Sequence, residues 1–378
     1  MKRTTKKNSR FTRLALNLVV AIGLALAFIY IFAGESQDVS VNSMNSQADL
    51  LYTQTTEEFK AVTADNPVAI PRDVGQNTAY QHAWWHLFAN VQDKAGNRYG
   101  IQWSYFRISN NPQDVPGWQN SQLYISHIVV SNDARVWKEQ RIARGGIGQA
   151  GVVNEPFKLW LDNWSWTSLN GTPFPGELKV DTDQFSVHLS STVAGPYVLP
   201  GERGYVSKGE NNKLASHNLT APFVDVSGEL KLGNGSSIRV QGQAWMSKEW
   251  GSGLLDVKQK GWDWFVFHLD NQTTLSVHHY RYQDAPNHVV ATLSTNSGKV
   301  IAINPEDIAI VALGEEILAG QKSIPLRWQI TVPKYGIDLT TQAQNTNLWL
   351  PFVMPYWEGP VTTIGSHRIQ GFMQLAGY

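Results

Sequence analysis

The stretch "WWHLFANVQDKAGNRYGIQWSYFR", residues 84–107, decides the fold. Its second half places large apolar residues at every second position, at Tyr99, Ile101, Trp103 and Tyr105. This spacing is the period of a β-strand with one buried face. The sequence "DKAGN" before it is typical of a hairpin turn, and another aromatic run precedes that turn. We therefore predict an antiparallel hairpin here.

A second stretch, "WDWFVFHLDNQTTLSVHHYR" at residues 262–281, repeats this order of Trp-rich strand, Asp-led turn and aromatic strand ending in Arg. Residues 185–209 and 337–365 form another matching pair, each with a strand, a polar stretch and then two prolines about four residues apart. Two matches in the same order predict two copies of one β-unit. Chance similarity between Trp-rich hairpins is the alternative. We place the domains at 76–235 and 236–378.

The body after residue 34 shows no long apolar helical periodicity, so we expect an all-β protein. Antiparallel units of this size hide their edges by closing into barrels. The predicted fold class is therefore all-β, with two tandem antiparallel β-barrels. Fifteen Trp residues indicate aromatic interiors, and an eight-stranded barrel leaves room for one small apolar ligand.

The N-terminus predicts a membrane anchor. Residues 1–13 are basic, and residues 14–34 form an apolar stretch that is interrupted only by Asn17 and long enough to span a bilayer. Basic residues before the span predict that the body lies outside the cytoplasm, anchored in the inner membrane. A cleaved signal peptide followed by secretion to the periplasm is the alternative. Residues 35–75 are predicted to be a polar linker, with a short helix around residues 57–62.

Charge and cysteine content exclude several classes of function. Without the six basic residues before the apolar stretch, the remaining 25 basic and 31 acidic residues give the body a net charge of about −6. This charge, without basic clusters, argues against nucleic acid as a partner. The absence of cysteine excludes disulfides, a thiol nucleophile and a thiolate metal site.

Six blocks of the sequence resemble a known family. They are "AWWHLFANVQDKAGNRYGIQWSYFR", "RIARGG", "PYVLPGERGYVSKG", "VQGQAWMSKEWGS", "GWDWFVFHLD" and "PYWEGPVTTIGSHRIQGFMQLAGY". In this order they resemble the AttH-like family over about residues 78–378. That family is related to the carotenoid 1,2-hydratases (hydroxyneurosporene synthases) and is often labelled as predicted secreted hydrolases. The resemblance implies two packed lipocalin-like barrels, and family members often accompany ABC-type exporters.

The resemblance also implies a catalytic position. In the carotenoid hydratases the block equivalent to residues 244–251 carries an Asp-His pair, where this chain has Ser247 and Lys248. Hydration needs an acid that protonates carbon, and a serine hydroxyl is too weak. Glu249 is the remaining candidate acid, and a regular strand places it on the same face as Ser247. A structural carboxylate paired with Lys248 is the alternative.

Further departures from the family concern the expected cavity. Ala83 and His86 stand where relatives show Glu and Tyr, and Ser216, His217 and Asn218 replace a segment with adjacent tyrosines. We predict that an apolar ligand contacts aromatic side chains in the Trp-rich strands and in the acid-aromatic clusters. These candidates are Trp84, Trp85, His86, Trp103, Tyr105, Trp245, Trp250, Trp262, Trp264 and Trp357.

Other motifs indicate neither a metal nor a cofactor. His82 and His86 are four residues apart, which on a strand separates them by about 13 Å and leaves a zinc ion without a third ligand nearby. The GxGxxG match at residues 146–151 lacks a following amphipathic helix, so we expect a glycine-rich loop there. Serine-hydrolase and zinc-protease motifs are absent from the sequence.

We therefore expect an extracytoplasmic protein that binds or processes an apolar small molecule or lipid, such as an isoprenoid or carotenoid, with an ABC-type transporter as a partner. A hydratase, isomerase or hydrolase that uses Glu249 as its acid is the alternative. A polysaccharide-binding envelope module is a third class, because acids beside Trp also line sugar sites.

Overall fold

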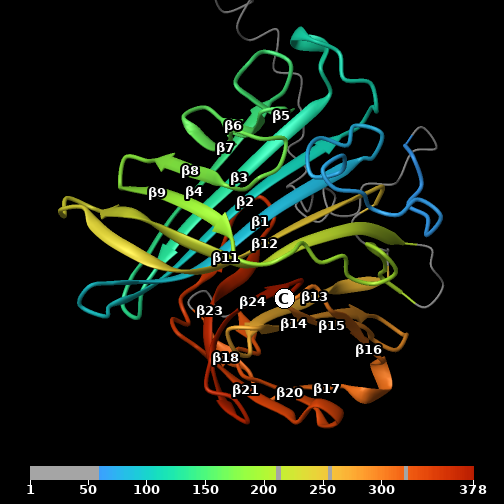
Figure 1. Ribbon diagram of the computed structural model, residues 1–378, viewed down its shortest axis with the longest axis vertical. Helices are drawn as coiled ribbons and strands as arrows, with labels where there is room; N and C mark the ends of the chain where they lie inside the picture. Colours follow the sequence, from blue (N-terminus) through green and yellow to red (C-terminus); the bar gives the residue numbers. More distant parts are fainter. Residues whose placement is uncertain (1–58, 210–213, 254–257, 319–321) are drawn as a thin grey trace, which may run out of the picture. The chain divides into compact units, whose positions relative to one another are not determined.

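The computed structural model describes residues 59–209, 214–253, 258–318 and 322–378. Within these residues every regular element is a β-strand, apart from three short 3-10 segments, so the all-β prediction is confirmed. The first sheet has twelve strands (Figure 1). They are β1 (His82–Asp93), β2 (Arg98–Ser109), β3 (Gln122–Ser131), β4 (Val136–Arg144), β5 (Ala150–Asn154), β6 (Phe157–Leu161), β7 (Trp164–Ser168), β8 (Gly176–Asp181), β9 (Phe185–Val193), β10 (Tyr205–Ser207), β11 (Ala215–Leu232) and β12 (Ile238–Gly251).

The second sheet has ten strands. They are β13 (Gln259–His268), β14 (Thr273–Tyr282), β15 (His288–Thr295), β16 (Val300–Ile303), β17 (Ala309–Ala312), β20 (Trp328–Val332), β21 (Ile337–Ala343), β22 (Trp349–Leu350), β23 (Tyr356–Gly365) and β24 (Gln370–Ala376). Strands β18 (Glu316–Ile317) and β19 (Ser323–Ile324) pair separately. The 3-10 segments are η1 (Gly117–Gln119), η2 (Pro305–Asp307) and η3 (Pro333–Tyr335).

The two sheets repeat one topology and both curl into barrels. The first runs β4-β3-β2-β1-β12-β11-β9-β8-β7 and then β6 and β5, and the second runs β16-β15-β14-β13-β24-β23-β21-β20-β17. In each, the opening hairpin lies beside the last strand of the unit, β12 or β24. A short strand, β10 or β22, pairs with the strand before that one. This correspondence supports the predicted duplication.

The predicted hairpin turns form through their aspartates. Asp93 Oδ1 accepts hydrogen bonds of 2.9 Å from the backbone nitrogens of Ala95 and Asn97, and Gly96 takes a positive φ of 83°. In the second unit, Asp270 Oδ1 accepts one of 2.7 Å from the nitrogen of Gln272. Short polar side chains that cap a turn in this way stabilise it locally, which explains why both hairpins were readable from the sequence.

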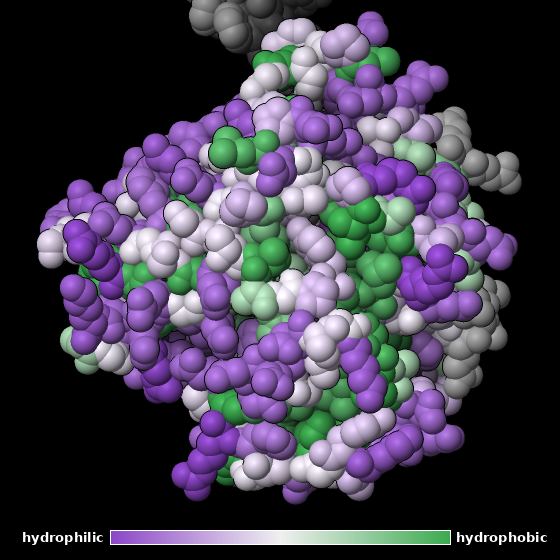
Figure 2. All heavy atoms as spheres, viewed as in Figure 1, coloured by the Kyte–Doolittle hydropathy of each residue, from purple (hydrophilic) through white to green (hydrophobic). Residues whose placement is uncertain are grey.

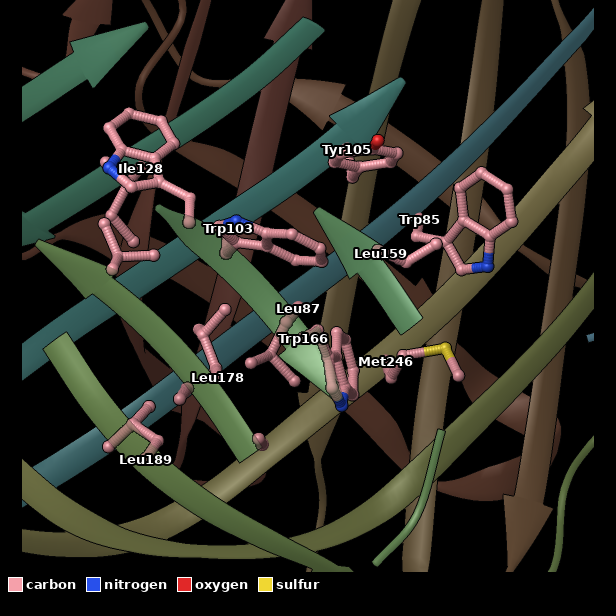
Figure 3. Close-up of a cluster of buried hydrophobic side chains, with 14 of the residues drawn as sticks. Trp85, Leu87, Trp103, Tyr105, Ile128, Leu159, Trp166, Leu178, Leu189 and Met246 are labelled. Atoms are coloured by element: carbon pink, nitrogen blue, oxygen red, sulfur yellow. The ribbon is translucent and has the colours of Figure 1, made fainter. Parts of the chain in front are cut away.

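The interior of the first barrel is filled by its own side chains. Figure 3 shows the buried side chains of Trp85, Leu87, Trp103, Trp166 and Met246 pointing toward one another. The rings of Trp103 and Trp166 meet edge to face with centroids 5.5 Å apart. Aromatic residues inside this barrel therefore build its core, and the expected ligand space inside it is occupied by protein.

Strands β1 and β2 are buried on both faces because the second barrel packs on their outer side. Phe88 and Trp245 from the first sheet cluster there with Trp264 and Phe372 from the second. The ring planes of Phe88 and Phe372 lie 12° apart with centroids 4.9 Å apart. A Cβ at Gly100 would lie 2.6 Å from Cγ of Pro360, so the glycine lets the two sheets approach closely.

The N-terminal part of the described chain belongs to the first barrel. Phe59, Val68 and Val74 are buried, and the Val74 carbonyl accepts a hydrogen bond of 3.1 Å from the indole of Trp85. Residues 59–75 are therefore packed against the barrel, which corrects this part of the predicted polar linker. Residues 59–62 form no helix, and the rest of the predicted helix and linker lies outside the described residues.

The chain passes from the first sheet to the second later than the boundary predicted at residue 235. That position lies in the turn between β11 and β12, and β12 pairs with both β1 and β11. The first sheet therefore continues to residue 251, and the second begins at residue 259. The sequence misplaced this point because β11 and β12 form one long hairpin whose turn looks like a domain limit.

In the part of the chain that the structure describes, no helix has the length and apolarity to cross a membrane. The predicted anchor at residues 14–34 lies outside this part. Hydrophilic residues cover most of the face in Figure 2, with smaller hydrophobic patches between them. Most large apolar side chains are therefore inside the barrels or between them.

Candidate functional site

A pocket lies between the two barrels. Its walls come from β1, β11 and β12 of the first sheet, from β13, β14 and β24 of the second, and from loop residues near β10. The lining residues are Trp84, His86, Pro200, Lys208, Asn218, Thr220, Ser247, Glu249, Gln259, Trp262, Trp264, His278, Tyr280 and Gln374. Both barrels are thus needed to form the site.

Strand alternation decides which side chains reach this pocket. On β1, Trp84 and His86 face the second barrel, whereas Trp85 and Leu87 belong to the core of the first. On β12, Ser247 and Glu249 face the pocket, and the intervening Lys248 points the other way. The predicted shared face of Ser247 and Glu249 is therefore present.

Glu249 forms an ion pair at the polar end of the pocket. Its Oε1 lies 2.5 Å from Nζ of Lys208, and the two side chains are 18% and 4% exposed. Nε2 of His82 is 4.0 Å from the same carboxylate oxygen. Burial, with smaller contributions from Lys208 and Arg107, lowers the pKa of His82 well below its usual value, so this imidazole is neutral. Lys208 is thus the cation that balances Glu249.

Lys248 is not the partner of Glu249, in contrast to the alternative drawn from the sequence. Its Nζ donates to the backbone carbonyls of Asp73 at 2.6 Å and Gly75 at 2.5 Å, and to the side-chain oxygen of Asn77. The ammonium also lies 4.3 Å from the ring centroid of Trp250. Burial lowers its pKa well below the usual value. Lys248 therefore fastens the N-terminal segment to the first barrel.

Several aromatic side chains form other parts of the walls. Trp84 and Trp262 meet edge to face across the two barrels, with centroids 6.1 Å apart. Trp264 stacks on His278 at 4.9 Å with ring planes 14° apart. Burial, with a contribution from Lys208, lowers the pKa of His278 to about 3, so this ring is neutral at pH 7. Burial, followed by the charge of Glu249, raises the pKa of Tyr280 well above its usual value, so its phenol keeps its proton.

The pocket is a narrow slot. The space between its walls, counted out to open solvent, is about 620 Å³, but a water-sized sphere can occupy only about 40 Å³. Pockets for drug-sized ligands usually hold about 300–1,000 Å³. For a ligand of that size to enter, the side chains must move apart.

The comparisons with known proteins identify the family. The sequence matches the AttH-like family over residues 61–378. The chain belongs to the AttH-like family. No curated protein matches the sequence. A crystal structure of an AttH from Nitrosomonas europaea is similar with a TM-score of 0.75 and 25% identity, over 85% of this chain and all of that one.

Two other solved structures share the fold of this AttH-like chain. Kievitone hydratase from Nectria haematococca has a TM-score of 0.61, and CghA, solved with Sch210972, has one of 0.51. Each is 13% identical, and each comparison covers 86% of this chain and 98% of the other. At this identity the likeness concerns the fold, which confirms the predicted two-barrel architecture.

In this AttH-like structure, four of the ten predicted ligand contacts line the pocket: Trp84, His86, Trp262 and Trp264. Trp245 lies in the adjacent aromatic cluster between the sheets. The other five are buried in the barrel cores, with Trp85, Trp103, Tyr105 and Trp250 in the first and Trp357 in the second. A contact between these five and a ligand in the pocket would require the cores to open.

Of the positions expected to depart from the AttH-like family pattern, some line the pocket and others lie on the core side of the first barrel. His86, Asn218 and Ser247 line the pocket. Ala83 lies in the core of the first barrel, and His217 bonds the Tyr80 hydroxyl at 3.2 Å on that side. Three of the positions expected to depart from the family pattern therefore line the pocket with polar groups.

Sequence reasoning missed Lys208, His278, Tyr280 and Gln374. The two histidines "HH" in β14 were visible, but only the strand register shows that His278 faces the pocket and His279 the interior. Lys208 gave no signal, because its contact with Glu249 crosses 41 residues of chain. Among the described residues, no group of three His, Asp or Glu side chains could hold a metal ion.

Proposed function

We propose that this AttH-like protein binds a flat apolar ligand bearing a hydroxyl or carbonyl group, in the pocket between its barrels. The observation that carries this proposal is the ion pair of Glu249 and Lys208 at one end of a slot walled by indole rings. The rings of Trp84, Trp262 and Trp264 offer faces and edges to an unsaturated or ring-shaped molecule. An ammonium donates and a carboxylate accepts, so together they satisfy a hydroxyl group. A lipid or isoprenoid with such an end fits this description.

Binding of 2-naphthol and naphthalene tests this proposal, because the two probes differ by one hydroxyl. Fluorescence of the pocket tryptophans of the full chain is expected to report tighter binding of 2-naphthol. Glu249→Gln should weaken 2-naphthol binding by about 10-fold, since a hydrogen bond to a charged group contributes about 1.5–3 kcal/mol. Binding of naphthalene should change less than about twofold.

The matched control is Glu229→Gln, which replaces a 53% exposed carboxylate in β11 outside the pocket lining. It should leave both affinities unchanged. Equal affinities for 2-naphthol and naphthalene in the unmodified protein, or no binding of either, would contradict the proposal.

A second candidate is a hydratase-type activity on the bound ligand. Kievitone hydratase shares the fold, and Glu249 lies in the pocket beside Ser247 and Tyr280. As the carboxylate of an ion pair, Glu249 offers lone pairs that can accept a proton and carries no proton to donate. We therefore assign Glu249 the role of the base that activates water, in place of the acid role inferred from the sequence. Glu249→Gln is expected to lower turnover by about 100-fold with little change in melting temperature.

We also propose that the body is held outside the cytoplasm by residues 14–34. The support is the basic N-terminus followed by an apolar stretch of spanning length. Alkaline phosphatase fused after Tyr378 should be active with the full chain and inactive when residues 14–34 are deleted. N-terminal sequencing then distinguishes an uncleaved anchor from a signal peptide. An inactive full-length fusion would count against an extracytoplasmic body, and an ABC-type partner stays a prediction from the family.

A further inference from the structure

A second pair of titratable groups lies in the wall of the pocket. Nε2 of His86, on β1, is 3.0 Å from Oε2 of Glu358, on β23 of the other barrel. The Ser104 hydroxyl lies 2.7 Å from the same imidazole nitrogen, and Gln374 donates its amide to the Glu358 carboxylate. His86 and Gln374 line the pocket. The pair therefore joins the two barrels directly beside the ligand space.

Both members of the pair are almost completely buried. The side chains of His86 and Glu358 are 2% and 1% exposed, and no lysine or arginine of the described residues forms an ion pair with Glu358. Burial of an isolated carboxylate costs folding free energy, whereas burial of a pair without net charge costs much less. A proton on this pair can be shared between the imidazole and the carboxylate, because Nε2 and Oε2 lie 3.0 Å apart.

The free nitrogen of His86 can pass this proton on. Within the described part of the chain, its buried Nδ1 has no hydrogen-bond partner, while Nε2 is taken up by Glu358 and Ser104. His86 is packed against Trp84, with ring centroids 4.6 Å apart, and lines the pocket next to that indole. A ligand held against Trp84 thus meets an imidazole whose second nitrogen is unused.

The strand register places this group at a set position relative to Glu249. In the β1–β12 ladder, Trp84 lies opposite Glu249, and His86 lies opposite Ser247. His86 and Glu249 are therefore diagonal neighbours on one face, about 7–8 Å apart.

We propose that His86 and Glu358 form the proton-donating pair of the pocket, with Nδ1 of His86 as the donor to an electron-rich atom of the bound ligand and Glu249 as the acceptor at the other side. This inference rests on the proposed function. The ligand class it implies is an unsaturated ring or chain whose carbon is activated by a neighbouring hydroxyl or double bond. The proton that leaves His86 is replaced from solvent after the ligand departs.

Exchange of the hydrogen at carbon 1 of 2-naphthol in D₂O measures this transfer. Deuterium moves from His86 Nδ1 to carbon 1, the phenolic deuteron moves to Glu249, and the ring becomes the keto tautomer. The keto tautomer then leaves the pocket and loses the original carbon-bound hydrogen to D₂O, while its oxygen takes a deuteron from solvent. Glu249 gives its deuteron to solvent, and His86 takes up a new one. The net change is replacement of one C–H bond by a C–D bond, with no oxidant or reductant, and mass spectrometry follows it.

The full chain is expected to accelerate this exchange relative to free 2-naphthol. Glu358→Gln should slow exchange by the bound probe about 100-fold, with its dissociation constant changed less than threefold. His86→Gln should slow exchange to a similar extent and serves if the first variant does not fold. Glu229→Gln is again a carboxylate-to-amide change at a distant exposed site. This variant should accelerate exchange of 2-naphthol as much as the unmodified protein does.

Each outcome bears on the inference. Binding without accelerated exchange overturns the role of the pair and leaves the binding proposal intact. Exchange at the unmodified rate in both Glu358→Gln and His86→Gln also overturns it. Failure of the unmodified protein to bind 2-naphthol overturns the proposed function and this inference together, so the two failures are distinguishable.

Discussion

Replacing Asp263 with alanine is expected to lower the free energy of unfolding by about 3–5 kcal/mol. Asp263 is fully buried inside the second barrel. Its carboxylate accepts hydrogen bonds from Nδ1 of His279 at 2.9 Å, from Nε of Arg281 at 3.2 Å and from the Tyr378 hydroxyl at 2.8 Å. Without the carboxylate, the guanidinium of Arg281, whose side chain is 15% exposed, would be left without its counter-charge.

Urea denaturation of the full chain measures this loss. Asp263→Asn keeps the shape of the side chain and removes its charge. Its free energy of unfolding should therefore lie between those of the unmodified protein and the alanine variant. Asp225→Ala, which removes an exposed carboxylate from β11, serves as the control and should change stability by less than about 0.5 kcal/mol. A similar small effect for Asp263→Ala would show that the cluster does not hold the second barrel together.

The fold was readable because its signals are local. Alternation at Tyr99, Ile101 and Trp103 reports a strand with one apolar face, and the aspartate-led turn at Asp93 joins it to its neighbour. The repeat of these signals at residues 262–281 predicted the duplication. Each signal lies within one hairpin, where sequence spacing determines spatial contact.

The site was only partly readable because it depends on the contact between barrels. Trp84 and Trp85 are adjacent in sequence, and both are largely or fully buried, but only Trp84 faces the pocket. Alternation separates the two faces of β1 without saying which one the second barrel covers. The pairs of Glu249 with Lys208 and of His86 with Glu358 join strands far apart in the chain, so no spacing rule could find them.

Acidification from pH 7 to pH 5 is expected to lower the free energy of unfolding through His127. This residue, on β3, is 1% exposed. Its Nε2 lies 3.1 Å from the side-chain oxygen of Gln140 and must therefore carry a hydrogen, which leaves Nδ1 to accept a hydrogen bond of 2.8 Å from Tyr356 of the second barrel. The bond from Tyr356 requires the neutral ring, because a protonated Nδ1 cannot accept. Burial, with a smaller contribution from His86, lowers the pKa of His127 to about 3.

The direction of this change in stability follows from the pKa of His127 in the folded and unfolded chain. In the unfolded chain a histidine has its ordinary pKa of about 6.5, so between pH 6.5 and about 3 the unfolded state binds more protons than the folded state. Stability is therefore complete above pH 6.5 and falls as the pH drops through this window. At pH 5 the loss from His127 alone is about 2 kcal/mol. The pKa values of His278, about 3, and His217, about 4, are also lowered by burial and add losses in the same direction.

His127→Gln separates this contribution from the others. The glutamine does not titrate, so the difference in unfolding free energy between pH 7 and pH 5 should be smaller by about 2 kcal/mol than in the unmodified protein. Tyr356→Phe removes the same hydrogen bond across the barrels but leaves a titratable ring, so its pH dependence should stay close to that of the unmodified protein. Equal pH dependence in His127→Gln and the unmodified protein would show that His127 takes up a proton in the folded state at pH 5. In that case Tyr356 could no longer donate to Nδ1, and the two barrels would be held together at acidic pH by their aromatic contacts, such as that between Phe88 and Phe372.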